Sequence, residues 1–249
     1  MVKERVDVVL ARKGLAPSRE KAQAFIMAGE VYIGSEQITK ADKKIEYAEP
    51  IEVRGNPVPY VSYGGVKLKK ALDAFAVDIK GKKALDIGSS TGGYVDCLLQ
   101  GGASLVYAID AGTHQLHEKL RNDPRITLRE NCNARYLRFE DLGEKVDIIT
   151  IDVSFISLKK ILPVAVQFIK NDGRIISLVK PQFEVGRFEV GKGGIVKSIE
   201  KIEAVITDMK TFGKTLGIEA LDVIESPREK EKKNREYFIL WEPQINLSR

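Results

Sequence analysis

The sequence predicts an α/β protein with a doubly wound, mostly parallel sheet, preceded by a small α+β domain. Three observations support this prediction. From residue 82 onward, short apolar runs alternate with stretches of helical periodicity, which is typical of a parallel sheet buried on both faces. The first 55 residues instead combine two short helices with short strands. A segment with two prolines lies between these parts, and 249 residues suffice for one medium and one small domain.

The composition excludes several classes of protein. The longest apolar stretch, residues 161–169, is about half of the roughly 20 residues that a membrane helix needs. The first 30 residues carry charges throughout and show no export signal. Cys97 and Cys132 form no disulfide framework, which suits a reducing cytoplasm, and with two histidines they make no convincing metal site. The net charge of +5 favours an acidic partner such as nucleic acid.

The first domain is expected over residues 1–55. The spacing of apolar residues predicts a helix over 5–13, and a second helix that begins with Ser18 as N-cap and ends at Gly29. Short strands are expected at residues 31–33 and 51–53. Two prolines and a Gly-Asn pair then predict a linker, which we place at residues 56–63.

The second domain, residues 64–249, shows the alternation that defines the fold class. Apolar runs predict strands at residues 84–87, 106–110, 126–128, 146–153, 175–179, 221–224 and 237–241. Helices are expected at residues 67–76, 93–100, 115–121, 158–170 and 199–216. Only a charged loop separates the last two strands, so they are predicted to form an antiparallel hairpin.

A glycine-rich loop follows the first strand of this domain, where open α/β sheets bind ligands. It comprises Asp86, Gly88, Ser89, Ser90, Thr91, Gly92 and Gly93. The spacing is not that of the dinucleotide-binding fingerprint, and the acidic residue would repel a pyrophosphate. It suits a cation instead, such as the ammonium and sulfonium of S-adenosylmethionine. The alternative is a packing turn beside a surface aspartate.

Two further residues are candidates for the same ligand. Asp110 ends the second strand, and a carboxylate there can accept hydrogen bonds from both hydroxyls of a ribose. Asn131 follows the third strand and is a candidate for contact with an adenine. Asparagine also commonly ends strands for conformational reasons, so that interpretation stays open.

Four charged residues stand where a buried sheet ends. Asp152 and Lys180 follow two central strands, Glu236 precedes the last strand, and Lys67 lies shortly before the first. Methyl transfer to a ribose hydroxyl benefits from a neutral lysine that takes the proton, or from an ammonium that steadies the alkoxide. The carboxylates would position the lysines and balance their charge. The alternative is an ion pair that caps two strand ends.

Taken together, the motifs resemble one family over nearly the whole chain. They include SYGGVKL at 62–68, ALDIGSSTGGYVDCLLQ at 84–100, IDVSFISL at 151–158 and LVKPQFEVGR at 178–187. The chain resembles the TlyA family, known as haemolysin A or as rRNA 2′-O-ribose methyltransferases, with an FtsJ-like, Rossmann-like methyltransferase domain. The resemblance implies S-adenosylmethionine as cofactor, ribosomal RNA as partner, a cytoplasmic location and the catalytic set Lys67, Asp152, Lys180 and Glu236.

The first domain resembles the S-four-type RNA-binding domain, in Arg5-Val6-Asp7 and in the run from Ser18 to Ala22. Such domains place basic residues of two helices on RNA phosphates. The resemblance implies that role for Arg5, Arg12, Lys13, Arg19 and Lys21. The alternative is a solvated basic helix face.

The sequence departs from the family at two places. Tyr63 stands where an arginine usually precedes the paired glycines, and residues 228–235 lack the glycines usual before Glu236. These departures leave open a second class, a non-catalytic RNA-binding factor of ribosome assembly on a methyltransferase fold. A direct pore former is not favoured, since no membrane-length helix is predicted and no membrane partner is expected.

Overall fold

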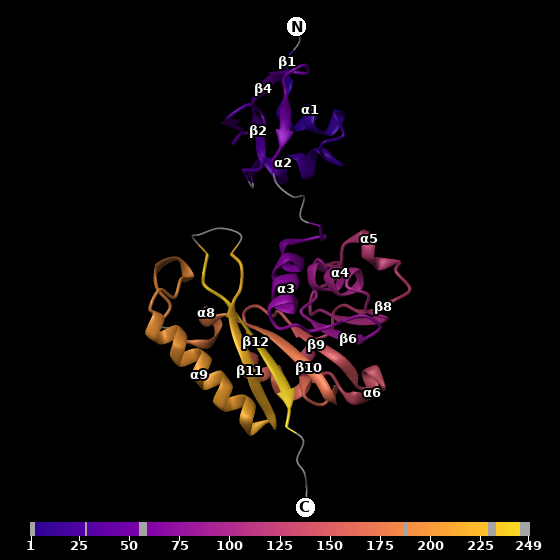
Figure 1. Cartoon of the computed structure of the whole chain (residues 1–249), viewed down its shortest axis with the longest axis vertical. Coiled ribbons are helices and arrows are strands. Elements are labelled where there is room, and N and C mark those ends of the chain that lie inside the picture. The colour runs from indigo at the N-terminus through magenta and orange to yellow at the C-terminus, as the bar shows by residue number, and fades with distance from the viewer. Residues whose placement is uncertain (1–2, 28, 55–58, 187–188, 229–232, 245–249) are drawn as a thin grey trace, which may run out of the picture. The chain divides into compact units, whose positions relative to one another are not determined.

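The computed structural model describes residues 3–27, 29–54, 59–186, 189–228 and 233–244. The chain divides into two compact units, Met1–Val58 and Pro59–Arg249 (Figure 1). Residues 56–58 of the predicted linker lie outside the described residues, as does the 229–232 part of the charged loop. Each unit is therefore considered by itself.

The first unit has two helices and short antiparallel strands around a small core. The helices are α1 (Val6–Arg12) and α2 (Arg19–Met27), close to the predicted ranges. The Lys21 amide donates to the Ser18 hydroxyl at 3.2 Å, which confirms Ser18 as the cap of α2. The strands are β1 (Lys3–Arg5), β2 (Val31–Ile33), β3 (Glu36–Gln37), β4 (Lys44–Glu46) and β5 (Ile51–Val53). Strand β1 pairs with β4, and β2 lies between β3 and β5.

The second unit is built on a seven-stranded sheet of order β11-β12-β10-β9-β6-β7-β8 (Figure 1). The strands are β6 (Lys83–Ile87), β7 (Leu105–Ile109), β8 (Ile126–Arg129), β9 (Val146–Ile151), β10 (Ile169–Val179), β11 (Ile218–Glu225) and β12 (Tyr237–Pro243). Strands β6 to β10 pair in parallel, whereas β12 runs antiparallel to both β10 and β11. The predicted fold class and the terminal hairpin are thus confirmed.

Three helices of this unit are long, and the others are single turns. The long ones are α3 (Tyr63–Ala74), α4 (Gly93–Gln100) and α9 (Ile199–Thr215). The short ones are α5 (Glu118–Arg121), α6 (Phe139–Leu142), α7 (Leu162–Ala165) and α8 (Pro181–Glu184), with 3₁₀ turns at 134–136, 158–160 and 192–194. Helix α3 begins earlier than the predicted residue 67, so the paired glycines before Lys67 lie in its first turn.

The prediction of one helix over 158–170 is wrong. A 3₁₀ turn at 158–160 is followed by the single turn α7, which has Pro163 at its start. Proline lacks an amide proton and disfavours helical geometry in the residue before it, so a helix cannot run unbroken through this position. The chain then enters β10 at Ile169, well before the predicted residue 175.

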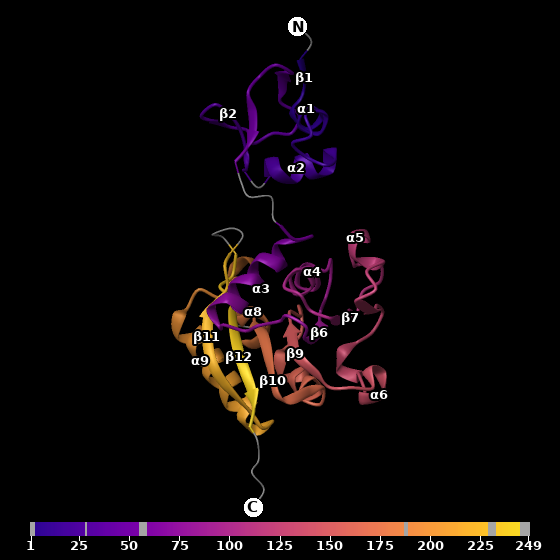
Figure 2. The ribbon, with the colours of Figure 1, turned by 45° about the vertical axis from the view of Figure 1, so that its right-hand side comes forward.

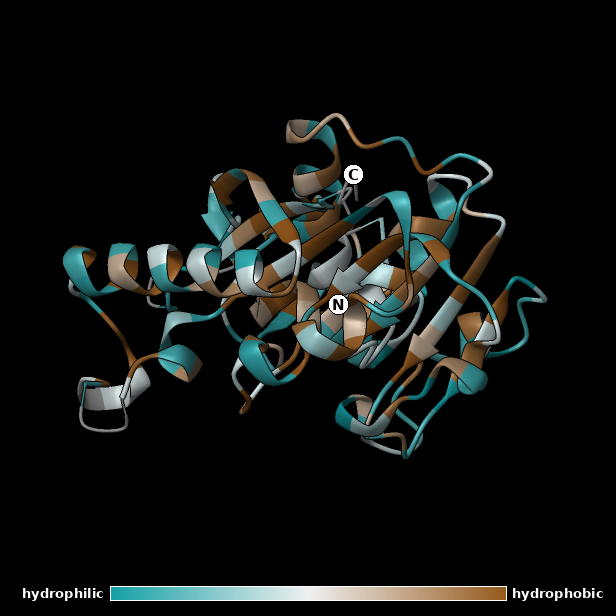
Figure 3. Cartoon of the chain, turned by 90° about the horizontal axis from the view of Figure 1, so that it is seen from below, coloured by the Kyte–Doolittle hydropathy of each residue, from teal (hydrophilic) through white to brown (hydrophobic). Residues whose placement is uncertain are grey.

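The two faces of the sheet bury alternate residues under different helices. Ala84, Val106 and Ile148 belong to the core shared with α3 and α4. Leu85, Tyr107 and Ile149 belong to the core shared with α7 and α9. Figure 2 shows α3 and α4 on one side of the strands and α9 on the other, and Figure 3 shows apolar residues along the central strands. Asp86 therefore points to the side of α3 and α4.

Candidate active site

The loop between β6 and α4 needs its glycines for two physical reasons. Gly88 and Gly92 have φ angles of +88° and +93°, a conformation that side chains rarely adopt. A Cβ at Gly88 would also lie 2.3 Å from the carbonyl oxygen of Asp152. The loop therefore passes close over the end of β9, and only glycine permits that approach.

Two aspartates flank this loop in different environments. The side chain of Asp86 is fully buried. Its Oδ1 accepts a hydrogen bond of 2.7 Å from the Thr150 hydroxyl, whereas its Oδ2 is buried with no hydrogen-bond partner among the described residues. Burial raises the pKa of Asp86 to about 7. Asp110 is partly exposed and accepts backbone hydrogen bonds of 2.7 Å from Ser90 and Gly112.

A cavity of about 710 Å³ opens at the carboxyl ends of β6, β7 and β9. Of the residues predicted from the sequence, Gly88, Ser90, Asp110 and Asp152 line it. The other predicted loop residues do not line it, and neither does Asn131. These loop residues are Asp86, Ser89, Thr91, Gly92 and Gly93.

Sequence reasoning missed several residues of this cavity. They include two segments, 132–135 and 153–157, together with Phe183. Each segment begins just after a residue that the sequence did single out, Asn131 or Asp152. Their position after a strand end was the signal that could have identified these residues. Apolar periodicity does not predict the path of an irregular loop, so it could not show which of them face the cavity.

The four charged residues at the strand ends form two ion pairs. The Lys67 Nζ lies 2.6 Å from Glu236 Oε2, which joins α3 to the start of β12. The Lys180 Nζ lies 2.5 Å from Asp152 Oδ1 and donates a hydrogen bond of 2.9 Å to the Ser154 hydroxyl. All four side chains are at most 21% exposed, so water screens these charges only weakly.

Cys97 and His117 have other places in the fold. Cys97 is buried, and burial raises the pKa of its thiol to about 12, so it is not a ready nucleophile. His117 caps α5 by accepting from the Lys119 amide at 3.1 Å. Among the residues that the structure describes, no three His, Cys, Asp or Glu side chains gather to hold a metal ion. No helix in the described ranges is long and apolar enough to cross a membrane.

In the first unit, a buried acid organises the basic helix face. The Asp7 side chain is fully buried and accepts from Arg5 at 3.0 Å, Arg19 at 3.2 Å and Gln23 at 2.7 Å. Burial acts to raise the pKa of Asp7, but the hydrogen bonds from Arg5, Gln23 and Arg19 outweigh it and hold the pKa well below its usual range. Arg5 and Arg19, each about half exposed, are thereby fixed side by side.

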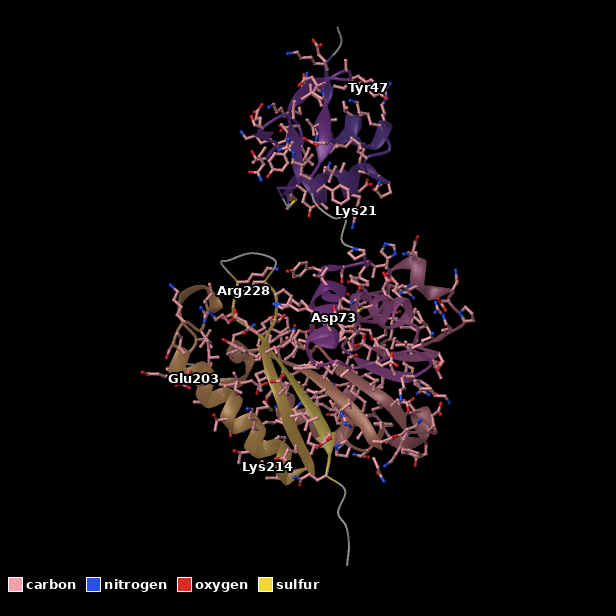
Figure 4. All side chains as sticks on the ribbon, viewed as in Figure 1. Lys21, Tyr47, Asp73, Glu203, Lys214 and Arg228 are labelled. Atoms are coloured by element: carbon pink, nitrogen blue, oxygen red, sulfur yellow. The ribbon has the colours of Figure 1, made fainter. Side chains whose placement is uncertain are left out.

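The other basic candidates of this unit lie against aromatic rings. Arg12 pairs with Glu4 and lies 5.0 Å from the centre of the Tyr47 ring. Lys13 donates to the Glu49 carbonyl at 2.7 Å and also approaches Tyr47. Lys21 lies 5.9 Å from the Phe25 ring. Figure 4 shows the side chains of Lys21 and Tyr47 at the surface of the unit.

The sheet order, the glycine loop after β6 and the acidic residue after β7 define the class as an FtsJ-like methyltransferase. The family model of that description matches residues 60–242, and the model for the S4 domain matches residues 4–46. The second unit thus carries the methyltransferase fold and the first an S4 domain.

Relatives of known name place the chain more closely. It is 41% identical over 236 residues to the 16S/23S rRNA (cytidine-2′-O)-methyltransferase TlyA of Mycobacterium tuberculosis, covering 94% of this chain and 88% of the relative. It is 39% identical to Hemolysin A of Brachyspira hyodysenteriae, covering 94% and 98% of the two chains. A solved structure from Streptococcus thermophilus that carries hemolysin in its name has a TM-score of 0.77 and 40% identity, over 98% of this chain and 90% of that one. The chain belongs to the TlyA family of FtsJ-like methyltransferases.

Proposed function

We propose that this protein transfers a methyl group from S-adenosylmethionine to a ribose 2′-hydroxyl of ribosomal RNA. The observation that carries the proposal is the two largely buried ion pairs at the strand ends, Lys67–Glu236 and Lys180–Asp152, of which Asp152 lines the cavity. The name of the M. tuberculosis relative, an rRNA (cytidine-2′-O)-methyltransferase, supports the substrate. A cytoplasmic location belongs to the same proposal, because ribosomal RNA is found there.

The described residues fit S-adenosylmethionine. The oxygens of Asp110 each accept one backbone hydrogen bond and keep lone pairs for the two hydroxyls of a ribose. The partnerless oxygen of Asp86 favours a positive charge near the loop. Gly88 lines the cavity, and the absence of a Cβ there lets the loop lie against Asp152. When bound, the cofactor supplies a methyl group that leaves its sulfur as the ribose oxygen bonds to it, the sulfur keeping the electron pair.

Lys180 is assigned the proton of the ribose hydroxyl. It is the most buried of the four charged side chains at 10% exposed, and Asp152 and Ser154 fix its Nζ from two directions. As the ribose oxygen bonds to the methyl carbon, its proton passes to the neutral Lys180 amine, which becomes an ammonium paired with Asp152. Lys67, held by Glu236, is assigned to steady the negative charge that develops on the ribose oxygen.

An exposed aromatic residue marks the side from which RNA would enter. Phe155 lines the cavity, is 91% exposed and has a φ angle of +64°, which is strained for so large a side chain. Its ring centre lies 5.2 Å from that of Phe183. Such a platform suits a base taken out of its stack, because every base can stack on an aromatic ring. The basic residues of the S4 domain are assigned to phosphates.

The test is transfer of labelled methyl groups to ribosomal subunits from cells that lack this protein, followed by mapping of the label. We expect label at a ribose 2′ position. Lys180→Ala and Lys67→Ala should each lower the rate by about 10²-fold or more, as removal of a proton acceptor or a charge-stabilising group does, with binding of cofactor and RNA retained.

Lys170→Ala is the matched control. Lys170 forms a 2.7 Å ion pair with Asp147, in the same strands β9 and β10 but away from the site. It should leave the rate unchanged. Wild-type rates in the Lys67 and Lys180 variants would refute their roles. Label on a base would refute ribose as the acceptor, and a protein that binds RNA but no cofactor would instead be the non-catalytic assembly factor.

A further inference from the structure

Tyr94 contacts the two elements that carry the Lys67–Glu236 pair; it lies in the motif at 84–100 without an assigned role and does not line the cavity. It is the second residue of α4 and only 4% exposed. A Cβ at Gly64, in the first turn of α3 before Lys67, would lie 3.4 Å from the Tyr94 ring. The ring centre lies 6.4 Å from that of Phe238, two residues after Glu236. The ring is therefore held by α3 and β12, which together present the Lys67–Glu236 pair.

The hydroxyl of Tyr94 faces carboxylates. Burial, and after it the negative charges of Asp152, Asp86 and Glu236, raise the pKa of Tyr94 well above its usual value of 10. The phenol thus stays protonated and can act only as a neutral donor toward these acids. Asp86 and its partner Thr150 lie on the sheet side that α4 covers, which explains why one phenol meets carboxylates from several strands.

No hydrogen bond of normal geometry joins this hydroxyl to any described residue. The Oδ1 of Asp152, although paired in charge with Lys180, is likewise buried and accepts no hydrogen bond of normal geometry from a described residue. A buried hydroxyl without a partner is unfavourable, and the nearby carboxylate is an acceptor. A small rotation of either side chain, or one bridging water, completes the contact.

We propose that Tyr94 is a positioning residue for methyl transfer, whose hydroxyl donates to Asp152 and so limits how strongly Asp152 holds the proton of Lys180. This inference rests on the proposed function. Lys180 must be neutral when the ribose hydroxyl arrives, yet Asp152 at 2.5 Å favours its ammonium form. A second donor on Asp152 withdraws part of the negative charge that Lys180 experiences. Tyr94 thereby leaves the Lys180 amine available to take the proton of the ribose hydroxyl.

The charged groups around this hydroxyl come from every element packed against it. Asp86 comes from β6, Asp152 from the end of β9 and Lys180 from the end of β10. Glu236 precedes β12 and is already neutralised by Lys67 of α3. Asp152 is therefore the acid whose charge bears directly on the proton of Lys180.

The test is the dependence of the single-turnover methyl-transfer rate on pH for Tyr94→Phe. If the rate of the wild type rises with pH to a plateau, its midpoint should move up by about 0.5–1 pH unit in the variant, because Asp152 loses one hydrogen-bond donor. At pH 7 the rate should fall about three- to tenfold. Cofactor affinity should stay at the wild-type value, because Tyr94 does not line the cavity, and thermal stability should fall by no more than the loss of one hydrogen bond allows.

Tyr107→Phe is the matched control. It also removes a phenol from a carboxylate, since Tyr107 donates to Glu144 at 2.7 Å, but it lies away from the two ion pairs. It should leave the midpoint unchanged. An active wild type whose midpoint does not move in Tyr94→Phe would overturn this inference and leave the proposed function standing. A wild type that transfers no methyl group to a ribose would overturn both.

Discussion

At the scale of one residue, the carboxyl group of Asp86 occupies an environment that opposes folding. The side chain is fully buried, and one of its oxygens has no hydrogen-bond partner among the described residues. An ionised carboxylate is strongly disfavoured in such a place, which is why burial raises the pKa of Asp86 to about 7. Its retention is understandable if a cation binds near the loop that it begins.

The raised pKa of Asp86 predicts how stability depends on pH. In the unfolded chain an aspartate titrates near pH 4, so between about pH 4 and 7 only the folded protein keeps this proton. The stability contributed by that proton is complete below about pH 4 and is lost as pH rises through 7. Without cofactor, Asp86→Asn should avoid this loss and be more stable than the wild type at pH 8, by about 2–4 kcal/mol.

Urea unfolding at pH 5 and pH 8 measures this difference. Asp73→Asn is a suitable control, since the Asp73 side chain is 63% exposed on α3. The control should follow the wild type at both pH values. An Asp86→Asn protein that loses as much stability as the wild type between pH 5 and 8 would contradict the assignment.

At the scale of elements, close contact between α3 and α4 places Lys67. A Cβ at Gly93 would lie 2.2 Å from the Ser62 hydroxyl oxygen and 2.9 Å from the backbone nitrogen of Gly65. The N-terminal ends of the two helices therefore approach closely only because Gly93 has no side chain. Helix α4 begins at the cofactor loop, and α3 carries Lys67 to Glu236, so this contact connects the predicted cofactor and catalytic residues.

Gly93→Ala should separate these helix ends and move Lys67 away from Glu236. We expect a fall in methyl-transfer rate of about 10-fold or more, as small displacements of positioned groups produce. Since Gly93 is not among the residues that line the cavity, cofactor affinity should fall much less than the rate. Calorimetric titration with S-adenosylmethionine alongside the rate assay separates the two effects. Equal losses in both would show that the contact supports the cofactor loop instead.

At the scale of the whole molecule, we propose that the two units divide the work of binding and chemistry. The S4 domain presents basic residues partly fixed by acids and rings, as Asp7 fixes Arg5 and Arg19. The methyltransferase unit presents the cavity and the ion pairs. Affinity for RNA should therefore depend mainly on the first unit and the rate of bound substrate on the second.

The salt dependence of RNA binding tests this division. Each phosphate contact contributes about 0.7–0.9 to the slope of log affinity against log salt. Lys13→Ala combined with Lys21→Ala should lower that slope by up to about 1.8 and leave the rate at saturating RNA intact. Lys214→Ala, an exposed lysine on α9, should leave the slope unchanged (Figure 4). A slope that responds to Lys214 and not to the S4 lysines would place the RNA on the other unit.

The sequence alone was sufficient to predict the sheet, its terminal hairpin, the glycine loop after the first strand of the second domain and the charged residues at strand ends. These features follow from apolar periodicity, glycine spacing and charges next to buried runs, which are local properties. Local patterns failed where the chain is irregular. The sequence predicted one helix over 158–170, but Pro163 interrupts it and β10 already begins at Ile169.

Only the tertiary structure decided which charges pair and which residues surround them. Lys67 and Glu236 are 169 positions apart along the chain, yet their side chains meet at 2.6 Å. The place of Tyr94 between α3 and β12, and the partnerless oxygen of Asp86, follow from how strands and helices pack and not from any motif. The physical reason is that burial and charge pairing depend on neighbours in space, which periodicity along a chain does not specify.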